Sequence, residues 1–214
     1  VIVGGEDFTV KGGSPNAAGL RKSVYTEDLA VKHKFPLVRL HEGGGGSVAG
    51  PSKEKKGYGG DPVFARSRFK SVAQTLKEVP VVSAALGPVA GLPASRFVGS
   101  HFRIMVKDNA QILVAGPAVV SRAFGKDFTK EELGGSDVHK KNGVTDNIAE
   151  SEEDAFNQIK KFLSFFPANI YELPPKKESK DATDRSEKLL EEIIPKDRKK
   201  TYEMREIIKM VVDD

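Results

Sequence analysis

Cysteine is absent from the 214-residue sequence, which excludes disulfides, zinc–thiolate sites and a cysteine nucleophile within it. No apolar run reaches the length of about 18 residues that a membrane-spanning helix needs, and no signal-peptide pattern opens the sequence. An excess of one charge sign is also lacking, because 34 basic and 30 acidic residues leave a formal net charge of +4. That charge is too small for the basic surface of a nucleic-acid-binding protein. We therefore expect neither a membrane nor a nucleic acid as partner.

Histidine is scarce, and its four occurrences do not predict a metal site. They are His33, His41, His101 and His139. None stands at metal-ligand spacing from another, so we expect no metal ion. His41 precedes Glu42 at the end of an expected strand, which fits either an acid/base pair or two solvated loop residues. Ser47 lacks the G-x-S-x-G context of an acyl-enzyme nucleophile.

The most informative stretch is VVSAALGPVAGLPASR, at residues 81–96. The apolar run after Pro80 indicates a buried strand, and Gly87, Pro88 and Gly91 then predict a turn that enters a helix. A turn of this kind presents free backbone N–H groups at the positive end of the helix dipole. That arrangement suits an oxyanion hole, although a strand-to-helix turn without a ligand has the same pattern.

The rest of the chain alternates short apolar strands with amphipathic helices, which predicts an α/β fold built from βα units. We expect strands at residues 1–3, 37–40, 81–86, 102–106, 111–114 and 144–148. We expect helices at residues 14–34, 65–76, 129–134 and 151–166, with a short one from residue 116. The first helix should bury a face made of Ala17, Leu20, Val24 and Val31. Thr129 with Glu132 forms a capping box, and Ser151 caps the last of these helices.

A run of four glycines, Gly43, Gly44, Gly45 and Gly46, invites comparison with nucleotide-binding loops. The loose G-x-G-x-x-A match is followed by Gly50, Pro51 and a lysine-rich loop at residues 51–60 where a helix should begin, and no lysine follows the last glycine as a Walker loop requires. Two interpretations remain. The run is either a flexible surface loop or a second backbone-lined wall that faces the turn within residues 81–96.

The composition changes near residue 173. Residues 173–184 are rich in proline, lysine and acidic residues, as in a linker, and two helical stretches at 185–194 and 202–212 follow around Pro195. The first residues already have the pattern of a strand, and the last ones contain no stop signal. We therefore expect the sequence to be a fragment.

Four blocks together carry a family resemblance. They are EDFTVKGGS at residues 6–14, GPVAG at 87–91, MVKD at 105–108 with GP at 116–117 and VV at 119–120, and EELGGSDVH at 131–139 followed by GVTD at 143–146. With them, the chain resembles the carboxyltransferase (beta) subunits of biotin-dependent acyl-CoA carboxylases, of the propionyl-CoA and methylcrotonoyl-CoA carboxylase type. The resemblance covers nearly the whole chain, and the last block is its most specific part.

The resemblance implies a crotonase-like α/β fold, a spiral of ββα units. Residues 1–172 would form the N-terminal carboxyltransferase domain with its start truncated, and residues 173–214 the linker and first helices leading to a missing C-terminal domain. The reaction implied is transfer of CO2 from carboxybiotin to the α- or vinylogous carbon of an acyl-CoA, through an enolate held by backbone amides. In this family one half binds acyl-CoA, the other binds carboxybiotin, and the active site lies between halves from two subunits.

By position in the family motifs, Gly91 and Leu92 would supply the amides that face the enolate. The residues that would border the CoA site are Gly12, Gly13, Ser14, Gly43, Gly44, Gly45 and Gly46. Two features depart from the family pattern. Leu92 and Pro93 stand where the family has glycine and alanine, and no arginine follows the glycine run. A different substrate or a weakened activity would account for them.

The cofactors and partners implied are biotin on a carrier protein, a biotin carboxylase subunit, and further copies of the chain in a hexameric core. The location implied is intracellular, in the mitochondrial matrix of a eukaryote and otherwise in the cytoplasm. An isolated fragment would be inactive. Two alternatives are a biotin-dependent acyl-CoA decarboxylase or transcarboxylase subunit, and a non-catalytic crotonase-like module that only binds CoA esters.

Overall fold

The computed structural model describes residues 1–14, 17–45, 68–169, 171–178 and 181–212. These residues fall into two compact units, Val1–Pro175 and Lys176–Asp214. The loop expected at residues 51–60 and the start of the helix expected at 65 lie outside the described residues. The assignment of residues 1–172 and 173–214 to named domains stays a prediction.

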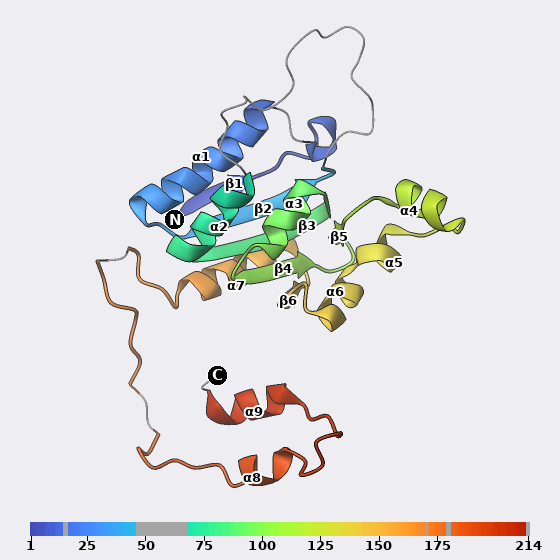
Figure 1. Ribbon diagram of the computed structural model, residues 1–214. Coiled ribbons are helices and arrows are strands. Elements are labelled where there is room, and N and C mark those ends of the chain that lie inside the picture. The colour runs from blue at the N-terminus through green and yellow to red at the C-terminus, as the bar shows by residue number, and fades with distance from the viewer. Residues whose placement is uncertain (15–16, 46–67, 170, 179–180, 213–214) are drawn as a thin grey trace, which may run out of the picture. The chain divides into compact units, whose positions relative to one another are not determined.

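The first unit is built on a parallel sheet of short strands, which confirms the α/β class expected from the sequence (Figure 1). Its strands are β1 (Ile2–Gly5), β2 (Leu37–Gly43), β3 (Val81–Ala90), β4 (Phe102–Val106), β5 (Gln111–Leu113) and β6 (Asn147–Ala149). The order is β1-β2-β3-β4-β6, and β5 pairs with the end of β3. Because every pairing is parallel, the carboxyl ends of β1, β2 and β3 lie along one edge.

Helices cover both faces of this sheet. The helices of the first unit are α1 (Ala17–His33), α2 (Arg68–Glu78), α3 (Leu92–Val98), α4 (Pro117–Phe124), α5 (Lys130–Gly134), α6 (Ser136–Asn142) and α7 (Glu152–Leu163), with a 3-10 turn η1 (Lys11–Gly13). Figure 1 shows α3 and α7 on opposite sides of the central strands. Fully buried Phe97 of α3, Ala84 of β3 and Ala155 of α7 belong to one apolar core.

Capping residues in the sequence predicted the starts of two helices correctly. The Thr129–Glu132 capping box is present at α5, and the Ser151 hydroxyl accepts from the backbone N–H of Asp154 at the start of α7. The strand expected at 144–148 begins later, at Asn147, because the Thr145 hydroxyl donates to the carbonyls of Arg103 and Asn147 and holds a turn there. Helix α6 was not expected, since the glycine pair before it indicated only a stop.

The turn expected at Gly87, Pro88 and Gly91 is much tighter than the sequence suggested. Strand β3 continues through Gly87 and Pro88 to Ala90, because β5 pairs with its last residues in register from Pro88 to Ala90. Only Gly91 leaves the strand, with φ +67°. The prediction of a glycine-rich turn over three residues was therefore wrong, and the change of direction is confined to one glycine.

The second unit contains α8 (Leu190–Ile193) and α9 (Met204–Val211). Both are shorter than the helical stretches expected at 185–194 and 202–212. Helix α8 stops at Ile193 because Pro195 disfavours helical geometry in the preceding residue, and Ile194 is accordingly extended.

Candidate functional site

Three glycine segments that are far apart in the sequence meet at the carboxyl ends of β1, β2 and β3. The N–H of Gly44 donates to the carbonyl of Gly12 at 2.9 Å. A Cβ on Gly13 would collide with the Glu42 carbonyl and lie 2.5 Å from the Cα of Gly43. A Cβ on Gly45 would lie 2.6 Å from the carbonyl oxygen of Ala90. We call this backbone surface, formed by Gly12, Gly13, Gly43, Gly44, Gly45 and Gly91, the glycine platform.

The platform includes most of the residues singled out from the sequence. Ser14 follows η1 and donates its N–H to the Lys11 carbonyl at 3.2 Å, and Gly46 lies outside the described residues. Gly43 to Gly45 pack between the η1 backbone and the Gly91 turn. Of the two interpretations of the glycine run, the described part fits the backbone-lined wall.

The Gly91 turn offers fewer amides than the sequence suggested. The N–H of Gly91 donates to the carbonyl of Leu113 at 3.2 Å, which joins the turn to β5. Helix α3 begins at Leu92, whose N–H belongs to the first helical turn and has no intrahelical acceptor. Pro93 has no N–H. In this arrangement the amide of Leu92, rather than a Gly91–Leu92 pair, is the donor at the helix start.

A cavity of about 500 Å³ lies next to the platform. It is bounded by β1, β2, α1, α3 and the η1 region, and Gly13, Ser14, Leu92 and Pro93 belong to its lining. Its volume falls within the range of about 300–1,000 Å³ that is usual for small-molecule sites. Gly13 belongs both to the platform and to the cavity lining, so the cavity reaches the platform at that glycine.

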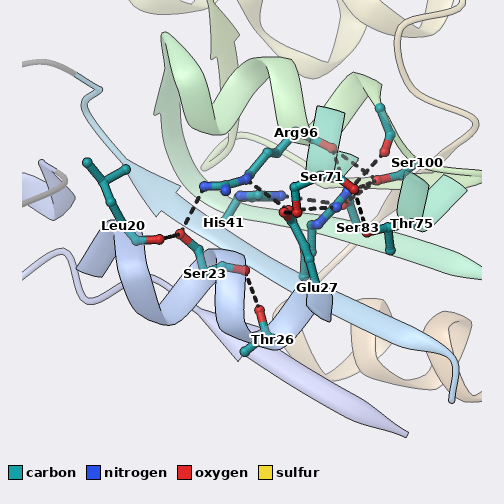
Figure 2. Close-up of polar contacts among 12 residues, drawn as sticks. Leu20, Ser23, Thr26, Glu27, His41, Ser71, Thr75, Ser83, Arg96 and Ser100 are labelled. Atoms are coloured by element: carbon teal, nitrogen blue, oxygen red, sulfur yellow. Dashed lines mark hydrogen bonds and ion pairs between the residues drawn. The ribbon is translucent and has the colours of Figure 1, made fainter. Parts of the chain in front are cut away.

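A buried charge cluster stands beside the cavity (Figure 2). Glu27 of α1 is 1% exposed, and its carboxylate accepts from Nη2 of Arg39 at 2.9 Å and from Nε of Arg96 at 3.1 Å. The Ser71 hydroxyl donates to the same carboxylate at 2.6 Å. Because these residues come from α1, α2, β2 and α3, the cluster joins four elements.

This cluster was not expected from the sequence, although the sequence carries a signal for it. Glu27 lies three residues after Val24 and four before Val31, on the face of the first helix that was expected to be apolar. A lone carboxylate on a buried helical face needs a cationic partner. The spacing alone did not say which of the chain's many basic residues would supply it.

Burial and neighbouring charges shift the pKa of Arg39 in opposite directions. Burial lowers the pKa of its guanidinium most, Glu27 raises that pKa, and the charge of Arg96 lowers it. Its Nη1 donates to the carbonyls of Arg96 at 3.2 Å and Gly99 at 3.0 Å, at the C-terminal end of α3. Arg39 therefore fixes the end of the helix whose start forms the Gly91 turn.

His41 does not pair with Glu42, so the acid/base pair suggested by their adjacency was wrong. The His41 ring is buried, with Nδ1 3.3 Å from the Glu6 carboxylate and Nε2 3.3 Å from the Ser83 hydroxyl. Successive residues of a strand point to opposite faces, which separates the two side chains. The solvated loop pair is excluded as well, since His41 is 2% exposed.

The expectations about a metal site and a membrane-spanning helix can be compared with the described residues only. Within it, no three or more histidine, aspartate or glutamate side chains are grouped so that they could hold a metal ion. No helix in the same residues is both long and apolar enough to cross a membrane.

The chain matches known proteins over its whole length. The family model described as carboxyl transferase domain matches residues 1–214. The propionyl-CoA carboxylase beta chain of Roseobacter denitrificans is 31% identical over 100% of this chain and 41% of its own length. The methylmalonyl-CoA decarboxylase subunit alpha of Veillonella parvula is 31% identical over 98% of this chain and 40% of its own.

Solved structures agree with these sequence matches. A transcarboxylase 12S structure, described as a hexamer assembly with methylmalonyl-coenzyme A and methylmalonic acid bound, superposes with a TM-score of 0.67. It is 28% identical, and the match covers 99% of this chain and 40% of that one. The expected carboxyltransferase fold of the crotonase-like class is thereby confirmed. The chain spans about two-fifths of the length of these relatives.

Proposed function

Because the chain belongs to the carboxyl transferase domain family, we propose that it is the acyl-CoA-binding part of the carboxyltransferase component of a biotin-dependent acyl-CoA carboxylase. The complete enzyme would transfer CO2 from carboxybiotin to the α- or vinylogous carbon of an acyl-CoA. The observation that supports this most directly is the glycine platform beside the cavity, because a thioester can approach backbone amides closely where no Cβ intervenes.

Enolate formation explains why backbone donors suffice. Loss of a proton from the α-carbon of a thioester places negative charge on its carbonyl oxygen, and preorganised N–H groups stabilise that charge as it develops. We assign this contact to the Gly91–Leu92 turn, with the Leu92 N–H as donor and the Gly91 N–H held by Leu113. Losing such a donor typically costs on the order of 3 kcal/mol of transition-state stabilisation.

The other glycines would border the CoA portion of the ligand. Gly12, Gly13 and Ser14 on one side and Gly43, Gly44 and Gly45 on the other leave a strip with almost no side chains. By the same proposal, the second side extends to Gly46. Biotin, carried by a partner protein, would supply the activated CO2. No residue of this chain is assigned to hold biotin.

Binding of an acyl-CoA tests the assignment. In calorimetric titration of propionyl-CoA into the 214-residue chain, we expect Gly91→Val to weaken binding by about tenfold or more, because valine is strained at φ +67° and would distort the turn that presents the Leu92 N–H. Gly125→Val is the matched control, since Gly125 also has φ +67° but lies at the end of α4 with nothing within 4 Å of a Cβ. A folded parent chain that gives no heat with propionyl-CoA, or equal weakening by both variants, would contradict the proposal.

Two further functions have specific support. A decarboxylase or transcarboxylase subunit is favoured by the names of two similar proteins. A non-catalytic module that only binds CoA esters is favoured by the Gly91–Leu113 hydrogen bond and by Pro93, which together reduce the free donors. Exchange of the α-protons of propionyl-CoA with deuterated solvent, measured on the full-length protein, separates the module from both enzymes, since only the enzymes stabilise the enolate.

The proposal extends to partners and location. A biotin carboxylase, a biotin carrier and further copies of the chain would complete the enzyme, and the chain alone would then lack carboxylation activity. The location proposed is inside the cell, in the mitochondrial matrix if the source is a eukaryote and otherwise in the cytoplasm.

A further inference from the structure

Strand β5 holds the Gly91 turn from one side and has no neighbouring strand on the other. Its residues are buried, and among the strands that the structure describes it pairs only with β3. The Leu113 carbonyl faces β3 and accepts from the Gly91 N–H at 3.2 Å. Successive carbonyls of a strand point to opposite sides, so the Ile112 carbonyl faces the outer edge, where a buried acceptor needs another partner.

That partner is His139 of α6. His139 is 9% exposed, and its Nε2 lies 2.8 Å from the Ile112 carbonyl oxygen. Because a carbonyl can only accept, Nε2 carries a proton and donates it to this hydrogen bond. The side-chain amide nitrogen of Asn142 lies 3.2 Å from Nδ1 and donates to it, while the Val144 N–H donates to the amide oxygen at 3.1 Å. Asn142 therefore favours the tautomer that His139 needs for its contact with β5.

The end of α5 closes on the same carbonyl. A Cβ on Gly134 would collide with the Ile112 carbonyl oxygen and lie 2.8 Å from Cδ2 of Leu113. The Gln111 side chain donates to the carboxylate of Glu131, which also belongs to α5. Strand β5 is thus held between β3 on one edge and the α5 and α6 contacts on the other.

We propose that His139 is a positioning residue for the Gly91–Leu92 turn. Its N–H holds the Ile112 carbonyl, which orients the next carbonyl, that of Leu113, toward the Gly91 N–H. The Gly91 turn then starts α3 at Leu92, whose N–H is the donor assigned to the enolate. His139 is not part of the cavity lining, so it acts on the candidate site through β5 and touches no ligand there.

Amide hydrogen exchange at Gly91, measured by NMR on the 214-residue chain, tests this role. His139→Leu keeps a buried apolar side chain and removes the donor. We expect exchange at Gly91 to become about tenfold faster or more, because β5 loses the hydrogen bond on its outer edge. Exchange at Val81, at the other end of β3, should change by less than about twofold. His139→Gln keeps an N–H donor for the Ile112 carbonyl, so most of the protection at Gly91 should return.

The matched control is His101→Leu, which removes another histidine that bonds to the backbone of β3. Nδ1 of His101 accepts from the Val81 N–H at 3.1 Å, so exchange should accelerate at Val81 and stay within about twofold at Gly91. Unchanged exchange at Gly91 in His139→Leu, or equal acceleration at both amides from a general loss of stability, would overturn the role. A His139→Gln variant that exchanges as fast as His139→Leu would do the same. If His139→Leu does not fold, ring nitrogen chemical shifts of the unaltered chain decide, since a proton on Nε2 supports the contact and a proton on Nδ1 alone contradicts it.

The effect on chemistry rests on the proposed function and is measured separately, on the full-length protein. His139→Leu should slow the exchange of the α-protons of propionyl-CoA about tenfold while changing its affinity by less than about twofold, because the Leu92 N–H contributes most as the enolate forms. His139→Gln should restore most of the rate. Weaker affinity with an unchanged rate would exclude the positioning role. If the unaltered protein exchanged no α-protons, the proposed function would fail, whereas the Gly91 amide measurement would still decide the role of His139.

Discussion

Replacement of Glu27 by glutamine is expected to lower the free energy of unfolding by about 3–5 kcal/mol, one of the two largest effects that the structure predicts. The substitution keeps the shape of the side chain and removes only its charge. Two buried guanidinium groups, Arg39 and Arg96, would then face each other without a carboxylate. Chemical denaturation of the 214-residue chain, followed by circular dichroism, measures the loss.

The matched control is Glu78→Gln, the same chemical change at a more open ion pair. Glu78 accepts from the Lys34 ammonium at 2.5 Å, and the two side chains are 31% and 33% exposed. Because water already screens that pair, we expect a much smaller loss than at Glu27. If the two substitutions lowered stability equally, the buried cluster would not be the junction of α1, α2, β2 and α3 that its contacts indicate.

Replacement of Gly13 by alanine should have an effect of similar size, about 2–5 kcal/mol. Gly13 has φ +66°, which costs a non-glycine residue about 1–2 kcal/mol. The new Cβ would also collide with the Glu42 carbonyl and crowd the Cα of Gly43, and both are backbone atoms of β2. Overpacking of this kind typically adds about 1–3 kcal/mol. The change would push η1 away from Gly43 and so disrupt the glycine platform, and acyl-CoA binding should weaken as well.

The variant Gly12→Ala separates backbone strain from overpacking. Gly12 has nearly the same backbone conformation, φ +63°, but nothing lies within 4 Å of a Cβ built there. We expect a loss of about 1–2 kcal/mol, from backbone strain alone. Denaturation curves of both variants measure the difference. Equal losses would mean that η1 does not rest on β2 as closely as its backbone contacts require.

Much of the local structure could be predicted because its causes lie within a few residues. The capping box of α5 depends on Thr129 and Glu132, three positions apart, and the end of α8 follows from Pro195. The strand at 102–106 is bounded by polar residues and has an apolar centre, and the structure gives it the same bounds. The α/β class followed from such elements in alternation.

The candidate site could be predicted only in part. Gly91 stood out because glycine permits a positive φ, and the structure places it at the turn. The hydrogen bond from the Gly91 N–H to the Leu113 carbonyl could not be predicted, because no pattern in the sequence indicates that β5 pairs with the end of β3. His41 was matched with its sequence neighbour, whereas its real partners, Glu6 and Ser83, lie 35 and 42 residues away.

The sequence by itself determined most of the strands and helices in chain order, the caps of α5 and α7 and the glycine at the Gly91 turn, since these depend on backbone conformation and on spacing along one element. Tertiary structure alone decided which glycines meet and which charges pair. Glu27 finds its partners 12, 44 and 69 residues away, across three other elements. The register of parallel strands and the packing of helices on them bring such groups together, and no local pattern records that geometry.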